Sequence, residues 1–160
     1  MKFHRALAYQ ATPEEVFAMI ADPAFRRQVA QAQNVASIEV TIQPRGDGLH
    51  VGVDQEQNTA GLPAIAKKIA GDTTRAIIAE EWSDHASGDY QITAPGKPTK
   101  AIGTVSIKPD GEGANYVLDL EVSVKVPLIG GKLEKVMSDQ IADGLQIEHR
   151  VGMAWLGGDR

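Results

Sequence analysis

The chain has 160 residues, a length typical of one domain, and it contains no cysteine, which excludes disulfides and thiolate metal sites. Sixteen Lys and Arg residues against 21 Asp and Glu residues give a formal charge of −5, which disfavours nucleic acid as a partner and stable docking on, or insertion into, an anionic membrane. No apolar run approaches the ~20 residues of a membrane span, and the N-terminus has no signal-peptide core, so a cytoplasmic location is expected.

The N-terminal part of the chain is predicted to contain one strand and two short helices. Residues 2–10 alternate apolar and polar side chains, as a half-buried strand does. Residues 12–15, "TPEE", form a capping box with proline at the first helical position, which predicts the start of a helix. A second short helix is expected from Pro23, with Phe25 facing inward and Arg26 facing solvent.

The central part of the chain is predicted to be a series of antiparallel strands. Alternating apolar positions and polar turns indicate six strands, at residues 37–43, 49–53, 73–83, 88–93, 100–109 and 115–126. The turn "PRGDG", residues 44–48, joins the first two strands as a hairpin. Residues 61–71 interrupt the series with apolar side chains at helical spacing between two glycines, and they predict a short helix or an ordered loop.

Residues 130–157 are predicted to form one long amphipathic helix. Its apolar side is expected to cover the sheet, because a sheet with one dry face needs a cover and no other element is long enough. Gln140, Gly144 and Glu148 interrupt that apolar side. Either this part of the helix borders a cavity, or Gly144 permits close packing and Glu148 lies in solvent beyond the sheet. The residues alone leave both interpretations open.

The order of these elements resembles that of the START-like superfamily, also called the SRPBCC or helix-grip fold. The segment "ATPEEVFAMIADPAFRRQ", residues 11–28, is similar to the superfamily's first strand-to-helix passage. The segment "VPLIGGKLEKVMSDQIADGLQIEHRVGMAWL", residues 126–156, is similar to its closing helix. The likeness extends to a bacterial member family that has no assigned function.

The resemblance implies an α+β helix-grip fold for residues 1–160 as a single domain. A curved antiparallel sheet of about seven strands would grip the C-terminal α-helix, with two short helices after the first strand and a cavity between sheet and helix. Relatives include carriers of lipids, sterols and other apolar molecules, polyketide cyclases and aromatases, proteins that deliver cofactors, and stress-response cochaperones. No catalytic set is shared across the superfamily, so no catalytic residue is assigned, and fold alone does not choose among these functions.

The leading hypothesis is a carrier that binds a small hydrophobic ligand, lipid-like or polyketide-like, in this cavity without catalysis and without a cofactor. The candidate lining residues are those that interrupt the last helix, the aromatic residues of the central strands and the apolar stripe of residues 61–71: Leu62, Ile65, Trp82, Tyr90, Gln140, Gly144 and Glu148. The alternatives are a cyclase- or dehydratase-type enzyme that uses Glu148 with a tyrosine or histidine, and a protein-interaction module. Nothing in the sequence indicates an oligomeric state.

Residue spacing disfavours two other kinds of site. Residues 126–132, "VPLIGGK", lack the first glycine of a phosphate-binding P-loop, and Leu133 stands where that loop has Ser or Thr. The two glycines are therefore expected to form only the bend before the last helix. The four histidines show no metal-binding spacing, so no metal site is expected.

Overall fold

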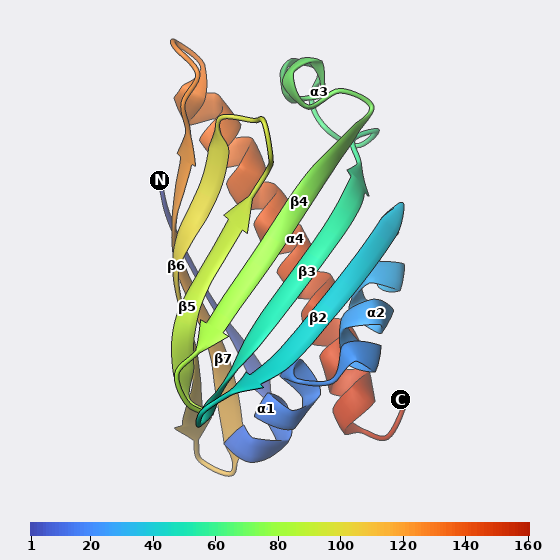
Figure 1. Ribbon diagram of the computed structural model, residues 1–160, viewed down its shortest axis with the longest axis vertical. Helices are drawn as coiled ribbons and strands as arrows, with labels where there is room; N and C mark the ends of the chain where they lie inside the picture. The colour runs from blue at the N-terminus through green and yellow to red at the C-terminus, as the bar shows by residue number, and fades with distance from the viewer.

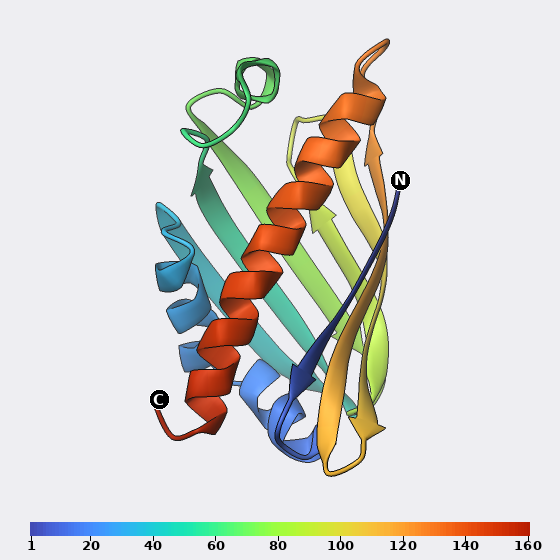
Figure 2. The same ribbon diagram turned by 180° about the vertical axis from the view of Figure 1, so that it is seen from behind.

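The computed structural model describes residues 1–160 and arranges them as a bent antiparallel sheet with four helices (Figure 1, Figure 2). In chain order the elements are β1 Lys2–Tyr9, α1 Pro13–Ile20, α2 Pro23–Ala32, β2 Ser37–Arg45, β3 Gly48–Asn58, α3 Ala64–Ala70, β4 Thr73–Trp82, β5 Ser87–Thr93, β6 Thr99–Asp110, β7 Gly113–Val124 and α4 Gly130–Leu156. The predicted α+β helix-grip architecture is therefore confirmed, including two short helices after the first strand.

All strand pairs in the seven-stranded sheet are antiparallel, in the order β1-β7-β6-β5-β4-β3-β2. The first strand therefore pairs with the last one, with Phe3 opposite Leu120 and Leu7 opposite Tyr116. β1 and β2 follow one another in the chain but lie at opposite edges of the sheet. The helices α1 and α2 carry the chain from one edge to the other (Figure 1).

The helix α4 crosses the concave face of the sheet along its whole length (Figure 2). Leu118 and Val122 of β7 share one buried cluster with Leu145 and Trp155 of α4, as the alternation of β7 and the helical spacing of α4 predict. The Trp155 ring meets Phe25 of α2 edge to face, with centroids 5.6 Å apart. Although α4 has 27 residues, neither it nor any other helix has the apolar length that crossing a membrane requires.

Two helix caps set the sharp turn of the chain after β1. The Thr12 side-chain oxygen accepts a hydrogen bond from the backbone N–H of Glu15, and a Glu15 carboxylate oxygen accepts one from the backbone N–H of Thr12, both at 3.2 Å. This is the capping box that the sequence predicts. The Asp22 carboxylate then accepts from the N–H of Ala24 at 2.9 Å, so α2 begins directly after α1 ends.

The β2–β3 hairpin is longer than predicted. Its turn consists only of Gly46 and Asp47, and not of residues 44–48. β3 continues to Asn58 although its apolar alternation ends at Val53, because backbone pairing with β4 persists through polar positions. Side-chain polarity alone therefore underestimated the length of this strand.

The double glycine before α4 has a steric role at its first position. A Cβ atom on Gly130 would lie only 2.6 Å from the carbonyl oxygen of Val124, so a side chain cannot be accommodated there. A Cβ atom on Gly131 would meet nothing within 4 Å. α4 begins at Gly130 itself. The glycine pair thus lies at the strand-to-helix bend, as predicted, and close approach to the end of β7 requires the first of the two.

Candidate functional site

A cavity of about 560 Å³ lies between the sheet and α4. Thirty-eight residues form its wall, and 21 of them are hydrophobic. They come chiefly from α2, β3, α3, β4, β5 and α4, so almost every layer of the fold contributes to it. A mainly apolar cavity of this volume is typical of a small-molecule site.

A buried ion pair stands at the α2 side of the cavity. Arg26 Nη1 and Nη2 donate hydrogen bonds of 2.7 and 3.0 Å to the two carboxylate oxygens of Glu80 on β4. Arg26 Nε donates to the carbonyl oxygen of Ile20 at 2.9 Å, and Trp82 Nε1 donates to Glu80 Oε1 at 2.9 Å. The arginine is 8% exposed and the glutamate 0% exposed. The pair is therefore hydrogen-bonded on several sides, which a buried charge requires.

The position of Arg26 corrects the sequence-based prediction that it faces solvent. Arg26 lies three and four residues before Val29 and Ala30, so it shares their buried stripe on α2. Burial acts to lower the pKa of Arg26, but the adjacent Glu80 carboxylate outweighs this and raises the pKa overall. Arg26 therefore remains charged inside the fold.

Glu148 is the buried carboxyl group on the cavity wall. It projects from α4, is only 9% exposed and accepts no hydrogen bond from the chain. Burial raises the pKa of Glu148 to about 7; Arg26 opposes this shift and Glu80 adds to it. Near neutral pH this carboxyl group is thus poised between its protonated and ionised forms, whereas Glu80 is tied to Arg26.

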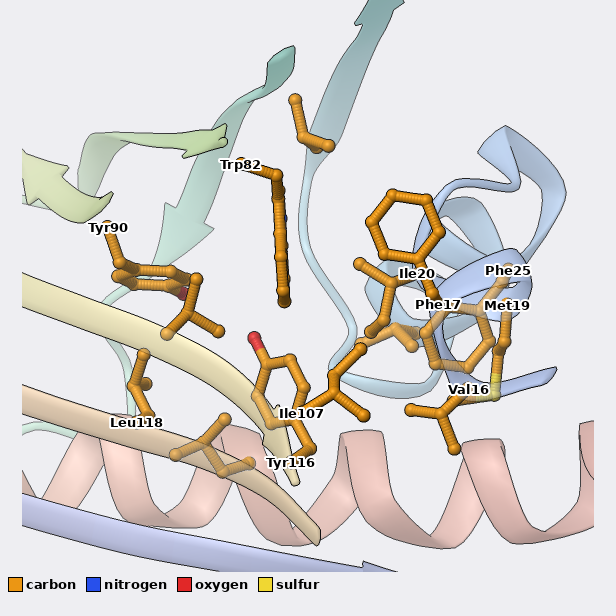
Figure 3. Packing of buried hydrophobic residues seen from close by; sticks show 14 of the residues in the cluster. Val16, Phe17, Met19, Ile20, Phe25, Trp82, Tyr90, Ile107, Tyr116 and Leu118 are labelled. Atoms are coloured by element: carbon orange, nitrogen blue, oxygen red, sulfur yellow. The ribbon is translucent and has the colours of Figure 1, made fainter. Parts of the chain in front are cut away.

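Polar side chains on the sheet face the same region. Tyr90 of β5 lies directly opposite Glu80 in the β4–β5 register, and Gln55 of β3, opposite Ala76 of β4, also lines the cavity. Burial raises the pKa of the Tyr90 hydroxyl, and Glu80 and Glu148 add to that rise. Figure 3 shows the Tyr116 hydroxyl of β7 directed toward the space between Tyr90 and Trp82. Of these groups, Tyr90 and Gln55 line the cavity, where they add polar atoms to the mainly apolar wall.

The structure brings most of the candidate residues together on the cavity wall. The residues that line it are Leu62, Tyr90, Gln140, Gly144 and Glu148. Gln140 is exposed and lies at the edge, whereas Tyr90 and Glu148 are buried within. Their role in holding a ligand stays a prediction, but their shared location removes the interpretation that Glu148 lies in solvent.

Two candidate residues, Ile65 and Trp82, do not line the cavity. Ile65 is 39% exposed, because Ala66 and Ile69 of α3 and the preceding Leu62 face inward and Ile65 lies on the outer side of α3. Trp82 belongs to the packed core, where its ring meets Phe17 edge to face with centroids 5.5 Å apart. These two assignments are corrected: one side chain faces solvent and the other supports the ion pair through its Nε1–H group.

Gly144 allows α2 to approach α4. Gln33, just past the end of α2, donates a hydrogen bond from Nε2 to the Gly144 carbonyl oxygen at 3.0 Å. A Cβ atom on Gly144 would lie 3.3 Å from that nitrogen. The glycine therefore serves close packing at the cavity wall, so the two interpretations of this position are both partly right.

α3 covers one end of the cavity. Its Ala66 packs against Val124 at the end of β7 and Leu133 in the first turn of α4. Lys97, in the β5–β6 turn, donates a hydrogen bond from Nζ to the carbonyl oxygen of Ile69 at 3.1 Å. α3 is therefore attached by a small apolar cluster and one exposed hydrogen bond, which is a weak attachment compared with the main core.

Three polar residues of this region, Arg26, Gln55 and Glu80, were not identified as site residues from the sequence. Gln55 continues the inward-facing alternation of Val51 and Val53 along β3, so the sequence pattern was enough to place its side chain on the inner face of the sheet. Glu80 has the same parity as Trp82 on β4, but the partner that makes its burial tolerable comes from a helix 54 residues away. No local pattern reveals such a partner.

Comparison with known proteins agrees with this geometry. Residues 5–156 match a family described as a protein of unknown function, DUF2505. An uncharacterized protein of Mycobacterium tuberculosis is 25% identical over 96% of this chain and 95% of its own length. The match therefore extends over nearly the whole of both chains.

Solved structures share the fold. A protein from Thermus thermophilus superposes with a TM-score of 0.67 at 21% identity, covering 96% of this chain and 98% of that one. A START superfamily protein from Mycobacterium smegmatis superposes with a TM-score of 0.53 at 19% identity, covering 94% and 96% of the two chains. With its START-like helix-grip fold and a family match over residues 5–156, this chain belongs to the DUF2505 family of proteins of unknown function.

Proposed function

We propose that this protein binds a small, mainly apolar molecule in the cavity between the sheet and α4, with one polar group of that molecule held at Glu148. The observation that carries the proposal is the Glu148 carboxyl group, which is only 9% exposed on the cavity wall, has no hydrogen-bond partner in the chain and keeps its oxygens accessible. A ligand that covers these oxygens replaces the water around them, so a hydrogen-bonding group at this point of the ligand is favoured.

The apolar part of such a ligand would be stabilised by burial. Val136 and Ile141 of α4 and Ile78 and Ile92 of the sheet line the cavity from opposite sides. Each square ångström of apolar surface removed from water contributes ~25 cal/mol before the costs of binding are subtracted. This lining favours a ligand with a hydrocarbon body over a sugar or a nucleotide.

The charges near Glu148 restrict the ligand's polar group. Arg26 and Glu80 satisfy one another through two hydrogen bonds, so neither offers a free charge. Glu148, with a pKa of about 7, is able to donate or accept a hydrogen bond near neutral pH. A ligand hydroxyl or carbonyl group fits these properties, whereas a ligand carboxylate would be repelled by Glu80 and by ionised Glu148.

Native mass spectrometry of the protein, purified gently from its source cell, is the direct test. We expect a noncovalent adduct whose mass and fragmentation identify an apolar molecule with a hydroxyl or carbonyl group. Absence of any adduct, together with no binding of lipid-like or polyketide-like probes to the purified protein, would contradict the proposed function.

A matched pair of tryptophan variants on α4 tests the location of binding with the neutral dye Nile red. Val136→Trp places a large ring in the cavity wall and should weaken dye binding about tenfold, a cost of ~1.4 kcal/mol. Met153→Trp adds the same ring at an exposed position near the other end of α4 and should leave affinity unchanged. Equal affinities in the two variants would place the dye outside the cavity.

A cyclase- or dehydratase-type reaction is the second candidate, and one observation favours it. A pKa of about 7 suits Glu148 to both donating and accepting a proton near neutral pH. Tyr90 is the tyrosine on the cavity wall, whereas His149 directs Nε2 to the Ala8 carbonyl oxygen at 2.7 Å. Glu148→Gln should abolish turnover of a polyketide-like substrate with little change in affinity. Unchanged turnover would remove Glu148 from the mechanism.

A further inference from the structure

The net charge of −5 conceals a strong separation of charge along the molecule. Three segments, residues 59–72, 94–100 and 124–135, together carry seven lysines and only two acidic residues, a formal charge of +5. The rest of the chain therefore carries −10. Figure 1 shows these segments, which are the connections β3–β4, β5–β6 and β7–α4 with the adjoining ends of β6, β7 and α4, at one end of the molecule, opposite α1 and the C-terminus. We call them the lysine-rich end.

The three segments of the lysine-rich end form one surface. Ala66 of α3 packs with Val124 and Leu133 from the β7–α4 connection. Lys97 of the β5–β6 turn is hydrogen-bonded to the carbonyl oxygen of Ile69 in α3. These contacts hold all three segments side by side at this end of the molecule.

The lysines of this end are available to a partner. All seven are exposed, and only Lys135 forms an ion pair, with Asp139 at 3.1 Å. Of the two acidic residues, Glu134 is already engaged, since it accepts a hydrogen bond from the backbone N–H of Val124 at 3.2 Å and lies 3.5 Å from the N-terminal ammonium group. The positive charge is thus largely uncompensated.

Two large apolar side chains project from the same end. Leu128, in the β7–α4 connection, is fully exposed and has a φ of +71°, a conformation that leucine rarely adopts. Ile65 projects from the outer side of α3 and is 39% exposed. Neither contributes to the core. Lysines around exposed apolar side chains are complementary to a surface that carries negative charge outside an apolar interior.

We propose that the lysine-rich end docks reversibly on an anionic lipid bilayer, with its lysines at the phosphate groups and with Leu128 and Ile65 inserted at the boundary of the acyl chains. Basic side chains near an anionic leaflet and apolar side chains at the interface both favour such binding. A nucleic acid would engage the lysines but leave Leu128 and Ile65 in water. The lipid surface is therefore the partner that uses both features.

This inference goes beyond the proposed ligand binding and does not depend on it. α3 bears Ile65, Lys67 and Lys68 on its outer side and lines the cavity with Ala66 and Ile69. Docking would therefore place α3 next to the lipid. α3 is the least firmly attached part of the cavity wall. An apolar ligand would then exchange with the bilayer without crossing bulk water.

Sedimentation with lipid vesicles tests the proposal on the full chain. We expect binding to vesicles of phosphatidylcholine with about 30% phosphatidylglycerol at low salt, little binding to pure phosphatidylcholine, and loss of binding at about 0.5 M NaCl, because salt screens exposed charges. No binding to the anionic vesicles at low salt would overturn the proposal. Retention on a polyanion column without vesicle binding would also overturn it and would indicate a polyanionic macromolecule instead.

Matched variants locate the docking surface. Lys67→Glu with Lys68→Glu should weaken vesicle binding at least about tenfold. The control is Lys108→Glu with Arg150→Glu, two exposed positions near the β6–β7 turn and in the last third of α4, which changes the net charge equally and should have little effect. Circular dichroism should show the native spectrum for both. Equal losses in the two double variants would overturn the assignment to this end.

A second pair of variants tests the contribution of the exposed apolar side chains to vesicle binding. Leu128→Gln should weaken vesicle binding about tenfold, because it removes an inserted side chain, whereas Met153→Gln alters an exposed apolar residue at the other end of α4 and should not. Ile141→Trp also places a large ring in the cavity wall, but Ile141 packs against the main core and not against the α3 cluster, so this variant should bind dye poorly but bind vesicles as well as the unmodified protein does. Docking and ligand binding can therefore fail separately, and the two outcomes are distinguishable.

Discussion

Arg26 on α2 and Glu80 on β4 are joined by two parallel hydrogen bonds, at 2.7 and 3.0 Å, in the interior of the protein. This pair ties a helix that lies at the β2 edge of the sheet to the sheet's centre. It also places a fixed pair of opposite charges beside the cavity, close enough to influence the pKa of Glu148. The ion pair therefore acts on both the fold and the candidate site.

Removing one member of this pair should be more damaging than removing both. Arg26→Met leaves the Glu80 carboxylate buried without its partner, and we expect a loss of about 3–5 kcal/mol in the free energy of unfolding. Arg26→Met combined with Glu80→Leu removes both charges and should recover much of that loss. Urea denaturation measures the difference. A double variant less stable than Arg26→Met would contradict this account of the pair.

Glu148 should make stability fall as pH rises toward neutrality. Its pKa is raised from 4.5 to about 7 in the folded state, so between these values the folded protein holds a proton that the unfolded chain has lost. The contribution of Glu148 to the free energy of unfolding is therefore most favourable below about pH 4.5. It falls by about 3 kcal/mol as the pH rises to about 7, and it does not change further above that pH.

The measurement compares the unmodified protein with Glu148→Gln, which cannot ionise. The difference between their unfolding free energies should decline between about pH 5 and pH 7 and become constant above about pH 8. Two parallel curves across this range would mean that Glu148 is not desolvated in the folded protein.

Two glycines of α4 should differ in their response to alanine. At Gly144 the added Cβ lies 3.3 Å from Gln33 Nε2, so the gain in helix propensity is offset by disturbance of the Gln33 hydrogen bond, and stability should change by less than about 1 kcal/mol. At Gly152 the added Cβ lies 2.8 Å from the buried Tyr9 ring, so a loss of about 1–3 kcal/mol is expected. Chemical denaturation of both variants checks the contrast. Equal effects would refute it.

Tyr90 and Trp82 should separate ligand binding from stability. Tyr90→Phe removes a hydroxyl group at the cavity wall and should weaken binding of a ligand identified by mass spectrometry by about 1 kcal/mol, roughly fivefold. Trp82→Phe removes a donor to Glu80 in the core and should lower the unfolding free energy while affinity stays nearly constant. Titration calorimetry and urea denaturation measure the two effects. A larger loss of ligand affinity in Trp82→Phe than in Tyr90→Phe would indicate that Trp82 belongs to the ligand-binding site.

Much of the fold was predictable because it depends on local patterns. The alternation along β7 identified its buried face, and the capping box at Thr12 identified the start of α1. A sheet with one apolar face and one long amphipathic helix leaves few ways to bury both. Strand length was harder to predict, because pairing between β3 and β4 continues beyond the last apolar residue of β3.

The candidate site was only partly predictable, because its polar members acquire partners from distant elements. Glu148 was noticeable as a carboxyl group on an apolar helix side, which needs no knowledge of its neighbours. Arg26 looked like an ordinary surface residue, because arginine usually is one and because Glu80 is far away in sequence. Ile65 was assigned to the wrong side of α3, since a helix of seven residues is too short for spacing to define its inward face.

The pairing of β1 with β7 also determines when the molecule can fold. β1 finds its neighbour only after residues 113–124 have been made. Until then its backbone hydrogen-bonding groups have no strand beside them, and residues from Phe3 to Tyr9 form an open edge that another chain could pair with. Closing contacts of such large sequence separation slow folding. The nascent chain is consequently exposed to aggregation through this edge until β7 has been synthesised.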